Sequence, residues 1–206
     1  MKIWLPFRKK RPLVAVIRFS GTIAADGRFG SSAISDHSTK NLIEKAFLRK
    51  NLSAVALLIN SPGGSPVQSS LIAARIRRLA EEKKIPVYAF VEDVAASGGY
   101  WLATAADKIY VDLSSIIGSI GVIYSGFGFQ KLIKNYGIER RIYTAGEEKS
   151  FLDPFKPENA EDINRLISLQ KEIHNAFVAQ VKNSRGDRLQ DKDIFTGEFW
   201  VGKTAK

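Results

Sequence analysis

Short apolar segments alternate with longer amphipathic segments along most of the chain. The apolar segments have the length of buried strands, and we predict strands at residues 13–19, 54–59, 86–91, 108–111 and 138–143. The amphipathic segments repeat their apolar residues at helical spacing, and we predict helices at residues 39–51, 66–79, 98–106, 129–136 and 158–183. Strands and helices in this alternation form βαβ units with parallel strands. The sequence therefore predicts an α/β fold on a mainly parallel sheet.

The second predicted helix carries its own start signal. Ser65 stands at the N-cap position, Pro66 at the first helical position, and Gln68 completes a capping-box pattern. The helix therefore begins directly after Asn60-Ser61-Pro62-Gly63-Gly64, a turn that ends the strand before it.

Length and composition fit one globular domain. The 206 residues are 45% hydrophobic and 25% charged. We expect a basic N-terminal arm at residues 1–12 and a single domain at residues 13–206. Cysteine is absent, which excludes disulfides, a thiol nucleophile and thiolate metal sites.

The positive charge is concentrated at the start of the chain. The net charge is 31 − 21 = +10, and the first eleven residues hold five basic residues and no acidic one. Trp4, Leu5 and Phe7 lie beside these cations, a combination that suits peripheral contact with an anionic membrane surface. A solvated chain end is the alternative. A nucleic-acid partner is not expected, because no basic stripe with interleaved aromatic residues recurs later.

No segment of the sequence has the apolar length of a transmembrane helix. Arg18 interrupts the apolar run that starts at Leu13, so a signal peptide is not expected either.

Two strand ends have the composition of a catalytic turn. The segments 60–64 and 93–100 each place two consecutive glycines between a strand and a helix. Backbone N–H groups left open by glycine can form an oxyanion hole, and Ser97 at the second turn is a candidate nucleophile. Two ordinary glycine-rich turns remain the alternative.

A serine nucleophile needs a base, and histidine is scarce in this chain. His37 lies in a predicted loop and is expected to be solvated, whereas His174 lies near the apolar face of the last predicted helix. A lysine base is therefore attractive, provided that apolar surroundings lower its pKa from about 10.4. Composition alone does not select the lysine. Ser168 and Lys171 match an S-x-x-K pattern, which we attribute to coincidence because its partner motifs are absent.

Four motifs resemble the signal peptide peptidase family, also called protease IV, in its short SohB-like form. They are residues 57–64 (LLINSPGG), 95–103 (AASGGYWLA), 106–110 (ADKIY) and 117–122 (IGSIGV), and the likeness runs from about Val14 to Ala205. The resemblance implies a crotonase or Clp protease-like α/β fold with ββα repeats. It also implies a serine peptidase that uses a Ser/Lys dyad and no cofactor.

The resemblance assigns roles to particular residues. Ser97 would be the nucleophile and Lys149, in the stretch Gly146-Glu-Glu-Lys149-Ser150, the general base. Phe151, Leu152, Pro154 and Phe155 would form the apolar wall around the lysine amine. The backbone N–H groups of Gly64 and Gly98 would form the oxyanion hole. The substrate-binding segment would consist of Gly118, Ser119, Ile120, Gly121 and Val122.

The resemblance also implies partners and a location. Peptide substrates are expected, such as signal-peptide remnants or membrane-protein fragments, together with assembly into a homo-oligomeric ring or dome. The N-terminal membrane helix usual in the family is missing here, so we expect a protein of the bacterial cytoplasm or one held peripherally at the inner membrane. The segment 200–206 leads into a further strand in the family, so we expect a truncated or altered C-terminal end.

Three other functions stay open from the sequence. A Clp-type protease shares the Ser-Pro-Gly-Gly turn but needs a histidine soon after its serine, and none follows Ser97 before His174. A crotonase-like acyl-CoA enzyme would use carboxylates and leave Ser97 idle. A non-catalytic scaffold at the membrane surface would keep the fold without the activity.

Overall fold

The computed structural model describes residues 11–25, 33–189 and 193–205. The first ten residues, which hold most of the predicted basic arm, lie outside the described residues. The chain forms two compact units: the first comprises residues 1–121 and 177–206, and the second comprises residues 122–176. The prediction of a single domain at 13–206 stays a prediction.

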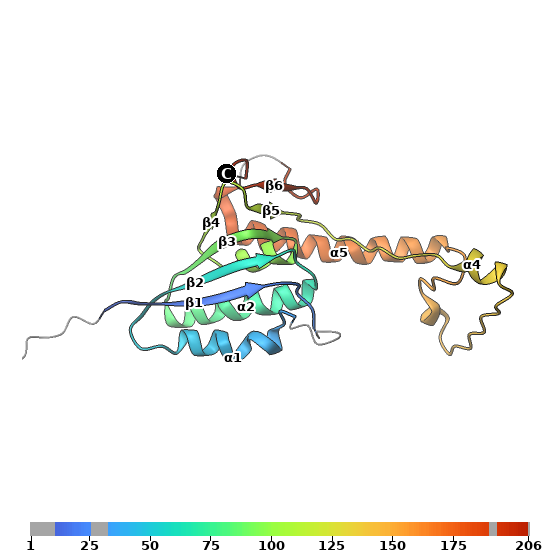
Figure 1. Ribbon diagram of the computed structural model, residues 1–206, viewed down its shortest axis with the longest axis horizontal. Coiled ribbons are helices and arrows are strands. Elements are labelled where there is room, and N and C mark those ends of the chain that lie inside the picture. Colours follow the sequence, from blue (N-terminus) through green and yellow to red (C-terminus); the bar gives the residue numbers. More distant parts are fainter. Residues whose placement is uncertain (1–10, 26–32, 190–192, 206) are drawn as a thin grey trace, which may run out of the picture. The chain divides into compact units, whose positions relative to one another are not determined.

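The first unit is built on a six-stranded sheet in the order β1-β2-β3-β5-β6, with β4 also paired to β3 (Figure 1). The strands are β1 (Leu13–Ser20), β2 (Leu52–Ser61), β3 (Val87–Ala96), β4 (Lys108–Val111), β5 (Ile116–Gly118) and β6 (Phe199–Val201). All neighbours run parallel except β5 and β6. The predicted α/β class with a mainly parallel sheet is therefore confirmed, and it agrees with the crotonase-like expectation.

Helices alternate with the first three strands of this unit. They are α1 (Asp36–Phe47), α2 (Pro66–Lys83) and α3 (Gly98–Ala103), and the last turns of α5 (Ala160–Arg185) also belong to this unit from Phe177 onward. In Figure 1, α1 and α2 lie on the same side of β1 and β2. Each helix returns the chain to the edge where the next parallel strand begins.

The core lies between the sheet and these helices. The inward side chains of β1 and β2 are fully buried, among them Phe19, Leu57 and Ile59. They meet apolar side chains of the two outer helices, including Ile43 and Ile76, which are also fully buried. This alternation of buried and exposed positions along β1 keeps its register fixed.

The strand β3 is shared by two partners along one edge. Its first half pairs with β4, from Tyr88 opposite Lys108, and its last residues pair with β5, from Val94 opposite Ile116. β5 in turn pairs on its other side with β6, which comes from the C-terminal part of the chain. The end of β3, where Ser97 follows, therefore lies inside the sheet rather than at its margin.

The start of α2 confirms the predicted cap in part. The Ser65 side chain accepts a hydrogen bond from the backbone N–H of Gln68. The Gln68 side chain does not reach back to Ser65; its Oε1 accepts a hydrogen bond of 2.8 Å from the backbone N–H of Asp36 at the start of α1. The glutamine thus links the starts of two helices, which the local pattern could not indicate.

The second unit holds α4 (Gln130–Asn135), the short 3-10 helix η2 (Glu147–Ser150) and the first part of α5. Phe129 packs against Phe155 with ring centroids 5.5 Å apart, and the Arg140 guanidinium lies 4.7 Å from the centre of the Phe155 ring. Arg140 also pairs with Asp153 at 3.0 Å.

The strand predicted at residues 138–143 is wrong, because this segment has no regular structure. Ile138 and Tyr143 are exposed, at 58% and 92%. A strand needs a neighbour for its backbone hydrogen bonds, and none of the described strands lies in this unit. Apolar composition alone therefore suggested a strand that has nothing to pair with.

Candidate functional site

Ser97 lies at the sharp turn between β3 and α3. Its backbone angles are φ 51° and ψ −121°, a conformation that residues with a side chain rarely adopt. Its N–H donates a hydrogen bond of 2.8 Å to the Gly118 carbonyl, and its carbonyl accepts one of 3.0 Å from Trp101. The side chain is partly buried and makes no capping hydrogen bond to the helix. The turn is thus held from both sides while the hydroxyl stays available.

The two glycine turns are in direct contact. A Cβ placed on Gly98 would lie 3.3 Å from the Gly64 nitrogen, and a Cβ placed on Gly63 would lie 2.7 Å from the Gly98 nitrogen. The N–H groups of Gly64 and Gly98 therefore lie side by side next to Ser97. Within the described residues neither N–H donates a hydrogen bond to another group.

The Gly63–Gly64 turn is fixed by the segment after β1. The Ile23 N–H donates a hydrogen bond of 2.9 Å to the Gly63 carbonyl, and the Ser65 N–H donates one of 2.8 Å to the Ile23 carbonyl. A Cβ on Gly64 would lie 2.0 Å from that same Ile23 oxygen, so no residue with a side chain fits here. The close approach of the backbone explains why this turn needs glycine.

Substrate-binding residues were predicted at 118–122, and the structure places Gly118 at the end of β5. β5 is paired on both sides, with β3 and with β6, so residues 116–118 offer no free edge. A free strand edge for pairing with a substrate peptide is therefore expected only at residues 119–122. Ser119 donates its N–H to the Glu198 carbonyl, and Gly121 donates its N–H to the Ser119 carbonyl at 2.9 Å.

A cavity of about 580 Å³ opens beside this segment, within the first unit. Its wall includes Gly118, Ile120, Tyr100, Trp200 and Arg185. Burial raises the pKa of the Tyr100 hydroxyl, and burial lowers the pKa of the Arg185 guanidinium. Gly118 therefore links the cavity to Ser97, because its carbonyl accepts the Ser97 N–H.

Lys149 lies in η2 of the second unit and is exposed. The residues predicted to wall its amine pack elsewhere: Phe155 lies against Phe129, while Phe151 and Leu152 line a cavity of about 630 Å³ inside this unit. The second unit by itself therefore leaves the lysine side chain in solvent. Ser97 and Lys149 stand in different units, and their pairing stays a prediction.

The two histidines and the S-x-x-K pattern lie on helices, outside the two glycine turns. His37 is exposed on α1, and His174 is half-buried on α5. Ser168 and Lys171 are both exposed on α5. Across the described ranges, no group of three or more His, Asp or Glu residues could hold a metal ion.

None of the helices in the described part of the chain has the length and apolarity needed to cross a membrane.

Gly63 belonged to the glycine turn predicted at 60–64 but received no role of its own, and Glu198 was not singled out from the sequence. Gly63 stands within contact distance of Gly98, and Glu198 holds Ser119 through its carbonyl. The repeated glycine of Ser-Pro-Gly-Gly was a signal for Gly63. No local signal could have indicated Glu198, because it directly precedes β6, almost eighty residues after Ser119.

Comparisons with known proteins bear on this site. The chain is 53% identical over 200 residues to the Na(+)/H(+) antiporter NhaA of Brucella melitensis, a match that covers 97% of this chain and 27% of that protein. It is 32% identical to the chloroplastic serine protease SPPA of Arabidopsis thaliana, over 95% of this chain and 29% of that protein. It is 31% identical to the probable protease SohB of Haemophilus influenzae, over 96% of this chain and 53% of that protein.

The chain thus spans about half, or less, of the length of these relatives. Residues 79–206 match the profile of peptidase family S49, a region that includes Ser97, Lys149 and the segment 118–122. Gly64 lies before the matched region. The predicted resemblance to the signal peptide peptidase and SohB proteases is confirmed, and with it the assignment to serine peptidases at the level of the family: the chain belongs to peptidase family S49.

Proposed function

We propose that this chain is a serine endopeptidase in which Ser97 is the nucleophile, Lys149 the general base, and the N–H groups of Gly64 and Gly98 the oxyanion hole. The observation that carries the proposal is the Ser97 turn. A serine with a positive φ lies beside two backbone N–H groups that donate no hydrogen bond within the described residues. Donors fixed in place before reaction stabilise the negative charge that develops on a carbonyl oxygen.

The chemistry follows from these groups. The Ser97 oxygen bonds to the peptide carbonyl carbon while its proton passes to the neutral Lys149 amine. The tetrahedral oxyanion lies against the Gly64 and Gly98 N–H groups. The carbon–nitrogen bond then breaks as the lysine returns the proton to the leaving amine, and water hydrolyses the acyl ester by the same route.

The exposure of Lys149 sets a condition on this reaction. A lysine acts as a base only when an apolar surface covers its amine, and the Lys149 side chain is exposed. The second unit does not supply that cover by itself. A homo-oligomer, in which a second copy covers the lysine and completes the dyad, would supply it and fits the ring or dome expected from the family.

The substrate side of the site favours a peptide in extended form. Residues 119–122 continue from β5, and the neighbouring cavity of about 580 Å³ has apolar walls from Ile120 and Trp200. An apolar or small substrate side chain beside the scissile bond would occupy it. Peptide fragments of membrane or signal origin, which are rich in such side chains, are the proposed substrates.

The test compares three single variants of the full chain. Ser97→Ala and Lys149→Ala should each abolish hydrolysis of fluorogenic apolar peptides while the circular dichroism spectrum stays unchanged. Lys134→Ala, a second exposed lysine of the same unit, should keep full activity. A serine-reactive phosphonate should label the unsubstituted protein at Ser97.

The outcomes separate the alternatives. Full peptidase activity of the Lys149→Ala variant would refute the base assignment. Absence of both labelling and hydrolysis in every oligomeric fraction would favour a non-catalytic scaffold. Tight binding of an acyl-CoA thioester without hydrolysis of peptides would favour the crotonase-like alternative.

A further inference from the structure

The amino ends of the strands in the first unit form a strongly basic edge. Because β1, β2, β3 and β4 are parallel, they all begin at the same edge of the sheet. Backbone hydrogen bonds from Leu13 to Asn51 and from Val55 to Pro86 hold the first three starts together. Six exposed cations stand at or just before these starts, and we call them the basic edge: Arg11, Arg49, Lys50, Lys83, Lys84 and Lys108.

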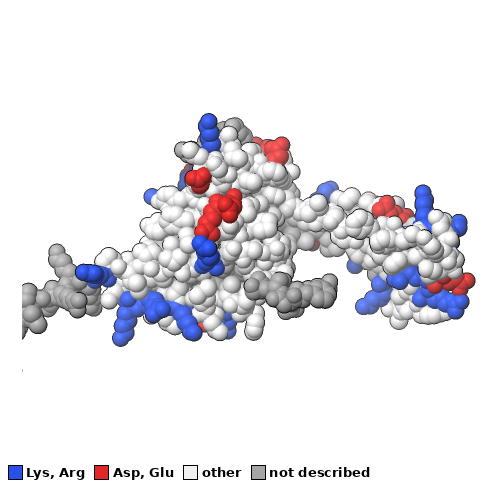
Figure 2. All heavy atoms as spheres, in the orientation of Figure 1, with Lys and Arg blue, Asp and Glu red and all other residues white. Residues whose placement is uncertain are grey.

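The acidic groups near this edge are bound to other arginines. Glu81 and Asp107 pair with Arg77, and Glu82 pairs with Arg78. In the ranges that the structure describes, none of the six cations of the basic edge forms an ion pair. Their charges are therefore uncompensated by the protein. Figure 2 shows this concentration of Lys and Arg at the lower left, where the strands begin.

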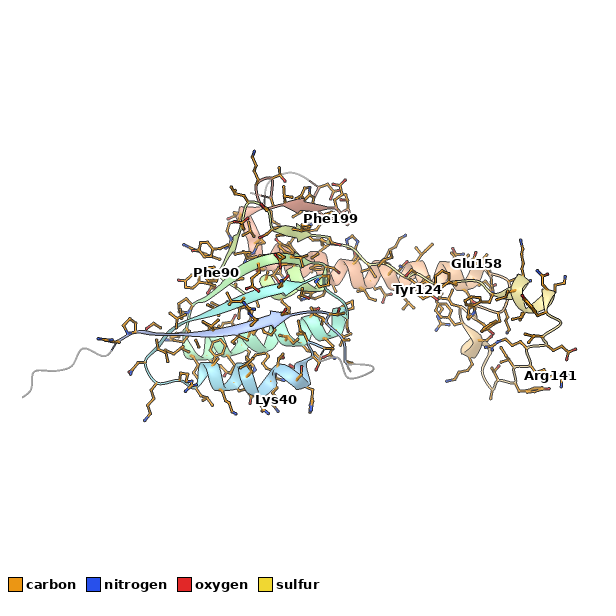
Figure 3. All side chains as sticks on the ribbon, in the orientation of Figure 1. Lys40, Phe90, Tyr124, Arg141, Glu158 and Phe199 are labelled. Carbon is orange, nitrogen blue, oxygen red and sulfur yellow. The ribbon has the colours of Figure 1, made fainter. Side chains whose placement is uncertain are left out.

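Exposed leucines lie among these cations. Leu48, which directly precedes Arg49, is 70% exposed, and Leu13 at the start of β1 is 39% exposed. Leu42 on α1 is 48% exposed. Figure 3 shows Lys40 on the same helix, on the side away from the sheet. An exposed leucine surrounded by cations is the pattern of a surface that enters the headgroup region of a bilayer.

We propose that the basic edge is a docking surface for an anionic lipid bilayer. Each cation near such a surface increases partitioning about fivefold, and the leucines add apolar contact. The sequence adds Arg8, Lys9 and Lys10 directly before Arg11. Single-stranded nucleic acid is the alternative occupant, because Phe90 on β3 and Tyr110 on β4 are 39% and 46% exposed and aromatic rings can stack on bases. The exposed leucines next to the cations favour the bilayer, and binding of RNA is an outcome of the test.

This docking would orient the site. Ser97 follows β3 at the opposite edge of the sheet, ten residues from the strand start at Val87. At about 3.3 Å per residue, the Ser97 turn would stand roughly 30 Å from the basic edge. The docked protein would therefore hold its catalytic turn away from the lipid surface, open to peptide segments that project from the membrane. The inference is independent of whether Ser97 is catalytic.

The test measures co-sedimentation of the full chain with vesicles. The anionic vesicles contain one part phosphatidylglycerol to two parts phosphatidylcholine, and the neutral vesicles contain phosphatidylcholine alone. The triple variant Arg49→Gln, Lys50→Gln, Lys83→Gln should lose about a hundredfold in partitioning to anionic vesicles. Circular dichroism and urea unfolding report whether this variant folds.

A matched triple variant controls for net charge. Substituting Gln at Lys131, Lys134 and Lys171, which are exposed in the second unit, removes the same charge and should change partitioning by less than about threefold at physiological salt. Leu48→Ser should also weaken binding to the vesicles. The proposal is overturned if both triple variants lose the same partitioning to anionic vesicles. It is overturned as well if the unsubstituted protein binds neutral vesicles as strongly as anionic ones. A third outcome that overturns it is tighter binding of single-stranded RNA than of anionic vesicles, with Leu48→Ser leaving the binding to vesicles unchanged.

Discussion

Replacing Gly63 by alanine should damage the Ser97 turn more than its own backbone strain explains. The added Cβ would lie 2.7 Å from the Ala96 oxygen, 2.7 Å from the Gly98 nitrogen and 2.9 Å from the Ser97 Cβ. Two of these atoms belong to the backbone and cannot rotate away. The two turns must therefore separate, and the oxyanion hole proposed from the Gly64 and Gly98 N–H groups would be lost.

The chain offers a matched control for this substitution. Gly21 has φ +102°, against +101° for Gly63, but a Cβ on Gly21 would meet nothing within 4 Å. Alanine at either position bears the strain of a positive φ, and only alanine at Gly63 adds a collision. Overpacking of this kind costs about 1–3 kcal/mol, so Gly63→Ala should lower the free energy of unfolding by that much more than Gly21→Ala.

The effect on activity should be larger than the effect on stability. Loss of one oxyanion-hole donor lowers kcat by about a hundred- to a thousandfold. The assay is the steady-state hydrolysis of an apolar fluorogenic peptide, together with urea unfolding of both variants. If Gly63→Ala keeps the kcat of the unsubstituted protein, or if both alanine variants lose equal stability, the close contact of the two turns is not what shapes the site.

Three further predictions concern stability. A hydrogen bond from Arg75 lowers the pKa of the Asp36 carboxyl group below 3.8. This carboxylate therefore stabilises the fold at neutral pH, and the stabilisation is lost as the pH falls through the folded-state pKa. The urea midpoints at pH 7 and in acid should differ less for Asp36→Asn than for the unsubstituted protein. Phe177→Ala should cost about 3–5 kcal/mol of unfolding free energy, because this ring is 2% exposed, whereas Phe127→Ala, at 80% exposure, should change it by less than about 0.5 kcal/mol. Ser97→Gly should unfold at higher urea concentration than Ser97→Ala, since glycine relieves about 1–3 kcal/mol of strain at φ 51°; equal midpoints would mean that the turn holds no strain.

The sequence was informative wherever the signal was local. The strand at 108–111 was predicted with its exact bounds. The glycine pairs of the segments 60–64 and 93–100 do lie after strands as predicted, but β2 and β3 extend into these segments, to Ser61 and Ala96. The helix expected at 158–183 is observed at Ala160–Arg185. In these segments local preference and tertiary packing favour the same structure.

Features that depend on distant partners were not predicted. β6 pairs with β5 across about eighty residues, and the Gln68 side chain bonds to the start of another helix. For the segment 138–143 the prediction was wrong, because its apolar residues suggested a strand where no described strand is available to pair with it. Pairing is a property of the fold as a whole, and a window of ten residues does not contain it.

The same distinction separates the two halves of the proposed dyad. Ser97 could be proposed as a nucleophile from its surroundings, because the two glycine turns that come together beside it are local backbone at neighbouring strand ends. A lysine becomes a base only through what covers its amine, and no residue adjacent to Lys149 in the sequence provides that cover in the second unit. The proposed nucleophile is thus positioned by one unit, whereas the proposed base depends on contacts that the isolated loop lacks. If a second copy provides that cover, as proposed, peptidase activity should rise with protein concentration.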